Sequence, residues 1–247
     1  MIEQLKRFQE ESGEKLPINP TFFVCSGTSG AGLSTAITQI VAAGLVRKPP
    51  TQFVTRLLRP NEERGDQYYS VTDAILEKIP QQIVLEAALH GNRYGFFEPA
   101  VERIKKILQR ESAIVDSANF KMEWANILDG QNIISIFFAP SDPKISLERI
   151  VLRARNSGAI ITKEELLKRA MSNASSVRRI SEFNYWINTT EFSTVIPDLA
   201  SIINFHGYRS GIPPSAVLIS ENKSQISLLM NSYSIDLTSY VEELSFS

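Results

Sequence analysis

A glycine-rich stretch near the N-terminus has the spacing of a loop that binds phosphate groups. It reads FFVCSGTSGAGLSTAITQIV over residues 22–41. Such a loop joins a strand to a helix and requires Gly, four residues, Gly, Lys and then Ser or Thr. Leu33 stands where the lysine is expected, whereas the glycines and hydroxyls are kept. The residues that we expect to bind a nucleotide are Gly27, Ser29, Gly30, Gly32, Leu33, Ser34 and Thr35.

Two oxygen-bearing side chains are candidates for a magnesium site beside this loop. The hydroxyl of Ser34 has the position that holds Mg²⁺ in loops of this type. Asp116 ends the apolar run AIVD, and its carboxylate is either a partner of the ion or a strand-end acid that faces solvent. Leu33 removes the ammonium group that would bridge the outer phosphates of ATP. Losing a preorganised charge contact costs about 10² to 10³ in rate.

Apolar runs alternate with helical periodicity, and these elements must position the loop and the acid. Continuous apolar runs predict buried parallel strands over residues 22–26, 113–116 and 133–140, and YWIN predicts a short strand over 185–188. Helices are predicted over residues 34–44, 97–110, 144–155, 163–181 and 190–205. Thr162 and Glu165 form a capping box before the fourth helix, and Pro197 predicts an interruption or bend in the last. The alternation predicts an α/β fold with a doubly wound parallel sheet flanked by helices.

Composition excludes several classes of function. The net charge of -1 gives no general attraction to nucleic acid or to an anionic membrane surface. A single cysteine, expected to be buried at position 25, and two histidines exclude an internal disulfide and a Cys/His zinc site. The N-terminal residues are charged and lack the apolar core of a signal peptide, and no apolar run has the length of a membrane span. We therefore expect a cytoplasmic protein.

Three further segments share their order and spacing with one known family. They are VTRLLRPNEERGDQYYSV (54–71), HGNRYG (90–95) and LRARNSGAIITKEELLKRA (152–170). Together with the glycine loop and with Asn188 after the last strand, they make the chain similar to the guanylate kinase family over roughly residues 20 to 205. Four motifs in register are a strong signal for a fold, whereas function must be argued from the site.

The resemblance implies an organisation in three parts. Residues 21–205 would form a P-loop domain that carries an acceptor-binding subdomain at about 52–96 and a helical lid at about 152–170. Residues 1–20 would be a helical N-terminal extension, and residues 206–247 a C-terminal extension of unknown role.

The resemblance also implies a site for the phosphate of an acceptor molecule. The matching residues are Arg56, Arg59, Tyr68 and Tyr94. A dianionic phosphate favours planar guanidinium groups and hydroxyl donors that converge on it. The alternative is that both arginines are solvated charges on a loop.

Three arginines match the arginine-rich lid of the family. Arg153, Arg155 and Arg169 would close over the phosphoryl group during transfer and neutralise its negative charge. Arginines are also common on the solvated faces of helices, and this alternative stays open for all three.

The base-reading positions of the family are altered in this chain. Leu85 stands where the family has the carboxylate that reads guanine, with Glu86 beside it. Gln52, Phe96 and Ala118 replace the family's other polar groups. A guanine-specific site needs a carboxylate to accept from N1 and N2 of the base, so we expect an acceptor that is not strictly GMP.

Two functions follow from the resemblance. The first is a phosphotransferase that uses ATP with Mg²⁺ and a small phosphate-bearing acceptor. The second is a catalytically inactive module that binds a phosphorylated ligand or a phosphorylated protein partner. HGNRYG also fits the related ribose bisphosphate kinases, which read no base. Another nucleotide, a sugar phosphate and a phosphorylated peptide all stay open, as does the oligomeric state.

Overall fold

The computed structural model describes most of the chain. The described residues are 19–48, 52–58, 64, 68–89, 91–117, 121–207 and 217–246. Most of the helical N-terminal extension expected at residues 1–20 lies outside them, as do Arg59, Ala118 and residues 208–216 of the C-terminal extension.

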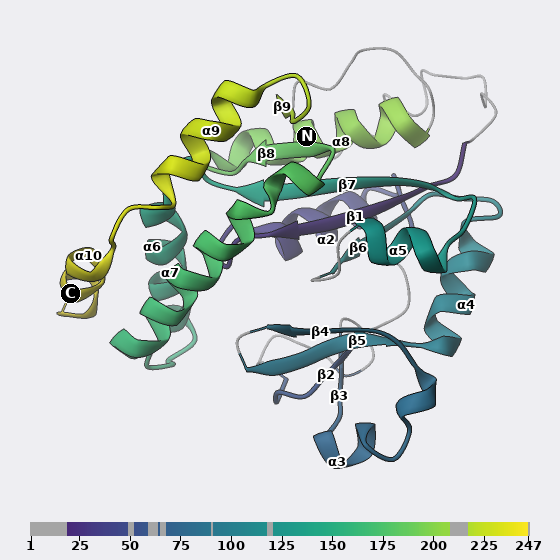
Figure 1. Ribbon diagram of the computed structural model, residues 1–247, viewed down its shortest axis with the longest axis horizontal. Helices are drawn as coiled ribbons and strands as arrows, with labels where there is room; N and C mark the ends of the chain where they lie inside the picture. The colour runs from purple at the N-terminus through teal and green to yellow at the C-terminus, as the bar shows by residue number, and fades with distance from the viewer. Residues whose placement is uncertain are drawn as a thin grey trace.

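A mainly parallel sheet forms the centre of the described molecule (Figure 1). The strand order is β6-β1-β7-β8-β9. The strands are β1 (Thr21–Gly27), β6 (Ala113–Asp116), β7 (Asn132–Ala139), β8 (Tyr185–Asn188) and β9 (Val217–Leu218). All pair in parallel except β9, which pairs antiparallel with β8. The parallel α/β sheet predicted from the apolar runs is confirmed.

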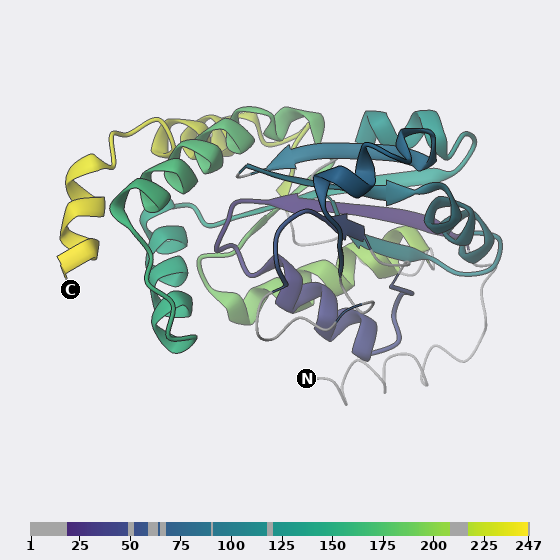
Figure 2. The ribbon, with the colours of Figure 1, turned by 90° about the horizontal axis from the view of Figure 1, so that it is seen from below.

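Helices cover both faces of this sheet, as Figure 2 shows. One face packs on α2 (Leu33–Ala42) and α8 (Phe192–Gly207). The other packs on α4 (Glu98–Ile107), α5 (Lys121–Ile127), α7 (Lys163–Arg178) and α9 (Lys223–Ser232). Side chains alternate along each strand, so a strand covered on both faces must be apolar at every position. Residues Phe22 to Cys25 are accordingly all fully buried.

A second, smaller sheet lies on one side of the first (Figure 1). Its strand order is β3-β2-β5-β4. It consists of β2 (Gln52–Val54), β3 (Tyr68–Ser70), β4 (Ile83–Leu89) and β5 (Asn92–Phe97), with α3 (Asp73–Leu76) and the 3₁₀ turn η1 (Pro80–Gln82) between β3 and β4. Buried Leu85 and Phe96 join the apolar cluster under α4 and α5, and they fasten this sheet to the main one.

Two antiparallel helices project beside the carboxyl end of the main sheet. They are α6 (Pro143–Asn156) and α7 (Lys163–Arg178). Thr162 caps α7 by accepting a hydrogen bond from the amide of Glu165 (3.2 Å), as the capping box predicts. Asp142 caps α6 in the same way through the amide of Lys144 (2.9 Å).

The five predicted helices all form, and each has slightly different boundaries in the structure. The helix predicted to begin at Ser34 begins one residue earlier, at Leu33. The helix predicted to reach residue 181 ends at Arg178, and the 3₁₀ turn η2 (Ile180–Glu182) follows. Of the two alternatives at Pro197, the interruption is wrong, because α8 runs continuously through it, and the bend stays a prediction. Proline removes one donor and crowds the carbonyl four residues earlier, and burial of the apolar face of α8 outweighs this cost.

The C-terminal segment, whose structure the sequence left uncertain, packs on the domain. Strand β9 extends the main sheet, α9 covers its edge, and α10 (Thr238–Phe246) lies against α6 and α7. Of the helices described, none is long and apolar enough to cross a membrane.

Candidate functional site

The glycine loop has the geometry of an anion-binding helix start. Gly30 and Gly32 have φ values of 88° and 81°, in the left-handed region that favours glycine. A Cβ on Gly27 would lie 2.5 Å from the carbonyl oxygen of Phe138, so only glycine fits there. Helix α2 follows at once, and its N-cap Gly32 provides no side-chain cap. The amides of the first turn have no acceptor within the helix and carry its positive dipole end, so they suit phosphate oxygens.

Leu33 is the first residue of α2 and lines the cleft at this helix start. Its side chain is partly buried and packs, like that of Phe192, against the apolar cluster under α2. The isobutyl group therefore rests on the core and brings no positive charge to the loop.

Ser34 and Asp116 meet at the end of β6. The Oγ of Ser34 donates to Oδ2 of Asp116 at 3.1 Å. The carboxamide of Gln52 donates to the backbone carbonyl of Asp116, which links the two sheets at this point. A hydroxyl and a carboxylate oxygen are ligands that Mg²⁺ prefers. Among the described residues no group of three or more His, Cys, Asp or Glu could hold a metal, so most ligands of an ion here would be water or phosphate oxygens.

One cleft of about 210 Å³ brings these residues together with the expected acceptor site. The phosphate-binding loop, residues 27–35, forms one wall. The remaining lining residues are Gln52, Arg56, Tyr68, Tyr94, Asp116, Arg153, Arg169, Ser172, Asn173 and Ser176.

Arg56, Tyr68 and Tyr94 form a compact cluster in this cleft. The Nε of Arg56 donates to the hydroxyl of Tyr94 at 3.3 Å, and its guanidinium lies 5.2 Å from the ring centroid of Tyr68. The two tyrosine rings meet edge to face at 6.1 Å. A planar cation from the loop after β2 and two phenol groups from β3 and β5 thus converge, as binding of a dianionic phosphate requires. Arg59 lies outside the described residues.

The lid arginines have three different positions. Arg169 is 17% exposed, donates to the Oγ of Ser29 (3.0 Å) and pairs with Glu165 (2.7 Å). Arg153 also lines the cleft. Arg155 is exposed and does not line it. Residues two apart on an α-helix point about 200° apart, so Arg153 and Arg155 cannot both face the cleft.

Comparison with known proteins agrees with this geometry. The sequence profile of the Guanylate kinase family matches residues 19–206. The chain belongs to the guanylate kinase family. This is a family of P-loop nucleotide kinases, and the resemblance of the motifs to it is therefore confirmed.

Individual relatives are distant but aligned along most of their length. A guanylate kinase from Hydrogenovibrio crunogenus is 26% identical over 189 residues, covering 74% of this chain and 86% of that protein. A guanylate kinase from Escherichia coli (strain K12) is 29% identical over 193 residues, with coverage of 74% and 86%. The crystal structure of guanylate kinase from Anaplasma phagocytophilum superposes with a TM-score of 0.57 at 17% identity, covering 90% of this chain and all of that one. That likeness supports the fold alone.

Apolar side chains occupy two of the altered base-reading positions. Leu85 and Phe96 are direct partners in the β4–β5 register. Both are buried, and Phe96 packs edge to face on Trp124 with ring centroids 5.0 Å apart. Neither side chain can accept a hydrogen bond from a base. Ala118 lies outside the described residues.

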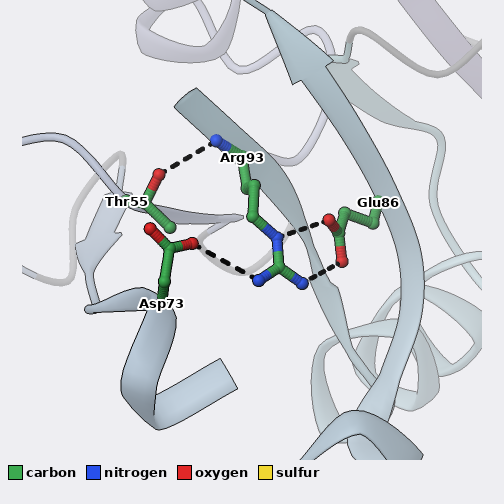
Figure 3. A network of polar contacts seen from close by, with 4 residues as sticks. All are labelled: Thr55, Asp73, Glu86 and Arg93. Carbon is green, nitrogen blue, oxygen red and sulfur yellow. Dashed lines mark hydrogen bonds and ion pairs between the residues drawn. The ribbon is translucent and has the colours of Figure 1, made fainter. Parts of the chain in front are cut away.

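Glu86 points away from Leu85 and Phe96, to the other face of the small sheet, where it forms an ion pair with Arg93 (Figure 3). Its two carboxylate oxygens accept from Nε (2.5 Å) and Nη2 (2.7 Å) of Arg93, whose Nη1 also reaches Asp73 (3.3 Å). The backbone amide of Arg93 donates to the hydroxyl of Thr55 (2.9 Å). The hydrogen bonds from Arg93 and its charge lower the pKa of Glu86, although partial burial opposes the shift.

Asn173 is a cleft residue that the sequence did not lead us to predict. Asn173 lies on α7, is 3% exposed, and bonds to the backbone of Ser29. It follows Arg169 by four positions, and residues with this spacing share a helix face. The spacing could have placed Asn173 beside Arg169, but only the packing of α7 on the loop gives it a partner.

Proposed function

We propose that the protein is a phosphotransferase that moves a phosphoryl group from ATP to a small phosphate-bearing acceptor that is not strictly GMP. A nucleoside monophosphate and a sugar phosphate are the two acceptor classes. The observation that carries the proposal is the single cleft shared by the loop, the cluster of Arg56, Tyr68 and Tyr94, and two lid arginines. Phosphoryl transfer depends mainly on positioning and charge, and such a cleft supplies both.

Each part of the cleft has a distinct role in this reaction. The amides at the start of α2 bind the phosphates of ATP. Ser34 and Asp116 would hold Mg²⁺, whose charge neutralises the β- and γ-phosphate oxygens. Arg56, Tyr68 and Tyr94, with Arg59, hold the acceptor phosphate.

The lid and the loop decide how fast the transfer runs. Arg169 and Arg153 face the phosphoryl group as its charge is redistributed. Arg155 would reach that group only if the lid helix α6 rotated. Leu33 makes the loop degenerate, because the ammonium that would bridge the outer phosphates is missing.

The selectivity of the acceptor site follows from its apolar positions. A site built to hydrogen-bond a base rejects the wrong ligand by 10⁴-fold or more, whereas an apolar site discriminates weakly. Because Leu85 and Phe96 carry no polar group and Glu86 is paired with Arg93, GMP gains little over other monophosphates. Isothermal titration with GMP, AMP and dTMP tests this, and a strong preference for GMP would contradict it.

A specific observation favours a second function, a catalytically inactive module that binds a phosphorylated ligand or partner. The acceptor cluster is complete as far as it is described, whereas Leu33 leaves the donor loop without its cation. Such a module would bind acceptor phosphates and transfer nothing.

The experiment that separates the two begins with a thermal-shift panel of nucleoside monophosphates, sugar phosphates and ATP with Mg²⁺. A ligand at a hundred times its dissociation constant stabilises the protein by about 2.7 kcal/mol, which is a visible shift. A phosphoryl-transfer assay with the best acceptor follows. Turnover that Arg169→Ala abolishes supports the kinase. Acceptor binding without turnover supports the inactive module. If Arg56→Ala and Arg59→Ala bind the acceptor as tightly as the parent protein, the acceptor site is wrongly assigned.

A further inference from the structure

The buried side-chain carboxamide of Asn173, on α7, holds the phosphate-binding loop. The amide of Ser29 donates to Oδ1 of Asn173 at 2.7 Å, and Nδ2 of Asn173 donates to the carbonyl of Ser29 at 3.2 Å. Asn173 is only 3% exposed. Because both ends of the carboxamide bond to the backbone of one residue, they restrain the position and the orientation of that part of the loop.

The neighbouring contacts reinforce this attachment. Arg169 lies one turn before Asn173 and donates to the hydroxyl of Ser29, while Glu165, one turn earlier again, pairs with Arg169. The hydroxyl of Thr28 lies 3.2 Å from that of Ser146 on α6. Gly30 also lies so close to α6 that an added Cβ would overlap the carbonyl oxygen of Ser146. The first half of the loop is thus fastened to both lid helices.

Without such an attachment, a glycine-rich loop becomes ordered only when its ligand binds. Its glycines have more backbone freedom than other residues, so fixing the loop in one conformation costs conformational entropy. Any ordering that occurs upon binding weakens the observed affinity. A loop already held in the binding conformation avoids this loss, which matters more when the lysine that would grip the phosphates is absent.

We propose that Asn173 is a positioning residue that holds the phosphate-binding loop in its binding conformation before ATP arrives. It also couples the loop to α7, because α7 cannot move away from Ser29 without breaking both bonds. The effect on ATP rests on the proposed donor role of the loop. The restraint on Ser29 does not.

The test compares Asn173→Ala with the full-length parent by amide hydrogen exchange in the ligand-free state. We expect exchange at Ser29 to rise at least tenfold, because opening no longer has to break the two bonds, while exchange in β7 stays within twofold. Asn173→Asp keeps an acceptor for the Ser29 amide but loses the donor to its carbonyl, so it should give an intermediate increase. Met171→Ala removes a 73% exposed side chain from the same helix and serves as the matched control.

Titration with ATP and Mg²⁺ gives the functional readout. Asn173→Ala should raise the dissociation constant for ATP about tenfold, and binding of the acceptor monophosphate should stay unchanged. A general loss of packing would instead raise amide exchange throughout the domain and weaken the binding of both ligands.

Four results would separate the proposals. Unchanged exchange at Ser29 in Asn173→Ala overturns the positioning role. A uniform rise in exchange across the domain also overturns it. If the parent binds no ATP, the donor function fails, but exchange at Ser29 still decides the role of Asn173. If Asn173→Ala does not fold, exchange is measured on Asn173→Asp instead, and unchanged exchange at Ser29 in that variant overturns the proposal.

Discussion

Adjacent residues of one strand have opposite surroundings in the small sheet. Leu85 is buried against Phe96, whereas Glu86 faces the other way and holds Arg93. Side chains alternate along a strand, so a one-residue difference moves a side chain from the face that packs on α4 and α5 to the opposite face of the small sheet. At the scale of single residues, this alternation decides that the acid beside the base-reading position is part of a structural ion pair.

The ion pair predicts a pH dependence for Glu86→Gln. Because Arg93 lowers the pKa of Glu86 in the folded state, the pair stabilises the fold above the unfolded pKa of about 4.3 and loses this effect as the pH falls below it. The variant should have a slightly lower urea midpoint than the parent at pH 7, and the difference should shrink as the pH falls below about 4.3. The exposed Glu77→Gln is the control. A difference that is independent of pH would contradict the charge-based account.

Leu33→Lys tests the missing cation directly. The rest of the loop keeps its glycines, Ser34 and the start of α2, so a lysine would find the phosphates already bound to amides. We expect tighter ATP binding and turnover raised by about 10² to 10³. Transfer assays on the parent and the variant, with the acceptor from the thermal-shift panel, check this. Unchanged turnover would show that Leu33 is not what limits the reaction.

At the scale of elements, the loop works because three elements leave it almost no space. Strand β7 crowds Gly27, helix α6 crowds Gly30, and Phe192 at the start of α8 crowds Gly32. Gly27 is thus required by its neighbour alone, whereas Gly30 and Gly32 are required by a neighbour and by their left-handed backbone. Close packing of this kind places the start of α2 beside the strand ends with little freedom.

Gly30→Ala and Gly44→Ala separate crowding from backbone strain. Both glycines are left-handed, with φ of 88° and 76°, but only Gly30 has a neighbour within 4 Å of an added Cβ. We expect Gly44→Ala to lower the free energy of unfolding by about 1 kcal/mol, and Gly30→Ala by about 3 kcal/mol or more. Urea unfolding measures both. Equal losses would mean that α6 yields easily and that the loop is less confined than the contacts indicate.

At the scale of the whole molecule, the C-terminal segment ties the lid to the sheet. The hydroxyl of Tyr233 donates to the carbonyl of Pro140 (3.2 Å), and burial raises the pKa of Tyr233 to about 12. Further along, Lys163 pairs with Glu242 (2.5 Å) and Val241 is fully buried in the cluster between α6, α7 and α10. We infer that residues 217–246 stabilise the position of the lid helices α6 and α7, which is a role for part of the C-terminal extension.

Val241→Ala tests this support. Removing two methyl groups from a fully buried site should lower the free energy of unfolding by on the order of 2 kcal/mol. Amide exchange should rise most in residues 152–170, because α10 packs on both lid helices. The exposed Glu243→Ala is the matched control. An equal rise in all parts of the domain would contradict a specific link between α10 and the lid.

Local patterns in the sequence were enough to predict the four parallel strands of the main sheet and the glycine loop, and the family resemblance was enough to predict that Arg56, Tyr68 and Tyr94 lie together, although their binding of an acceptor stays a prediction. Apolar runs identify buried strands because both faces of a parallel sheet are covered. Glycine spacing identifies the loop because few other residues adopt its backbone angles. Arg56, Tyr68 and Tyr94 were predicted together because each belongs to a short motif whose order along the chain is preserved.

The remaining features depend on which helix faces and strand faces meet, and local patterns do not encode this. Periodicity could not choose between Arg153 and Arg155, since either could have faced the cleft until α6 packed on its neighbours. Asn173 reaches Ser29 across 144 positions of sequence, and Lys163 reaches Glu242 across 79. Contacts of this length form only when whole elements are packed, so the tertiary structure alone decided how the loop, the lid and the C-terminal segment are joined.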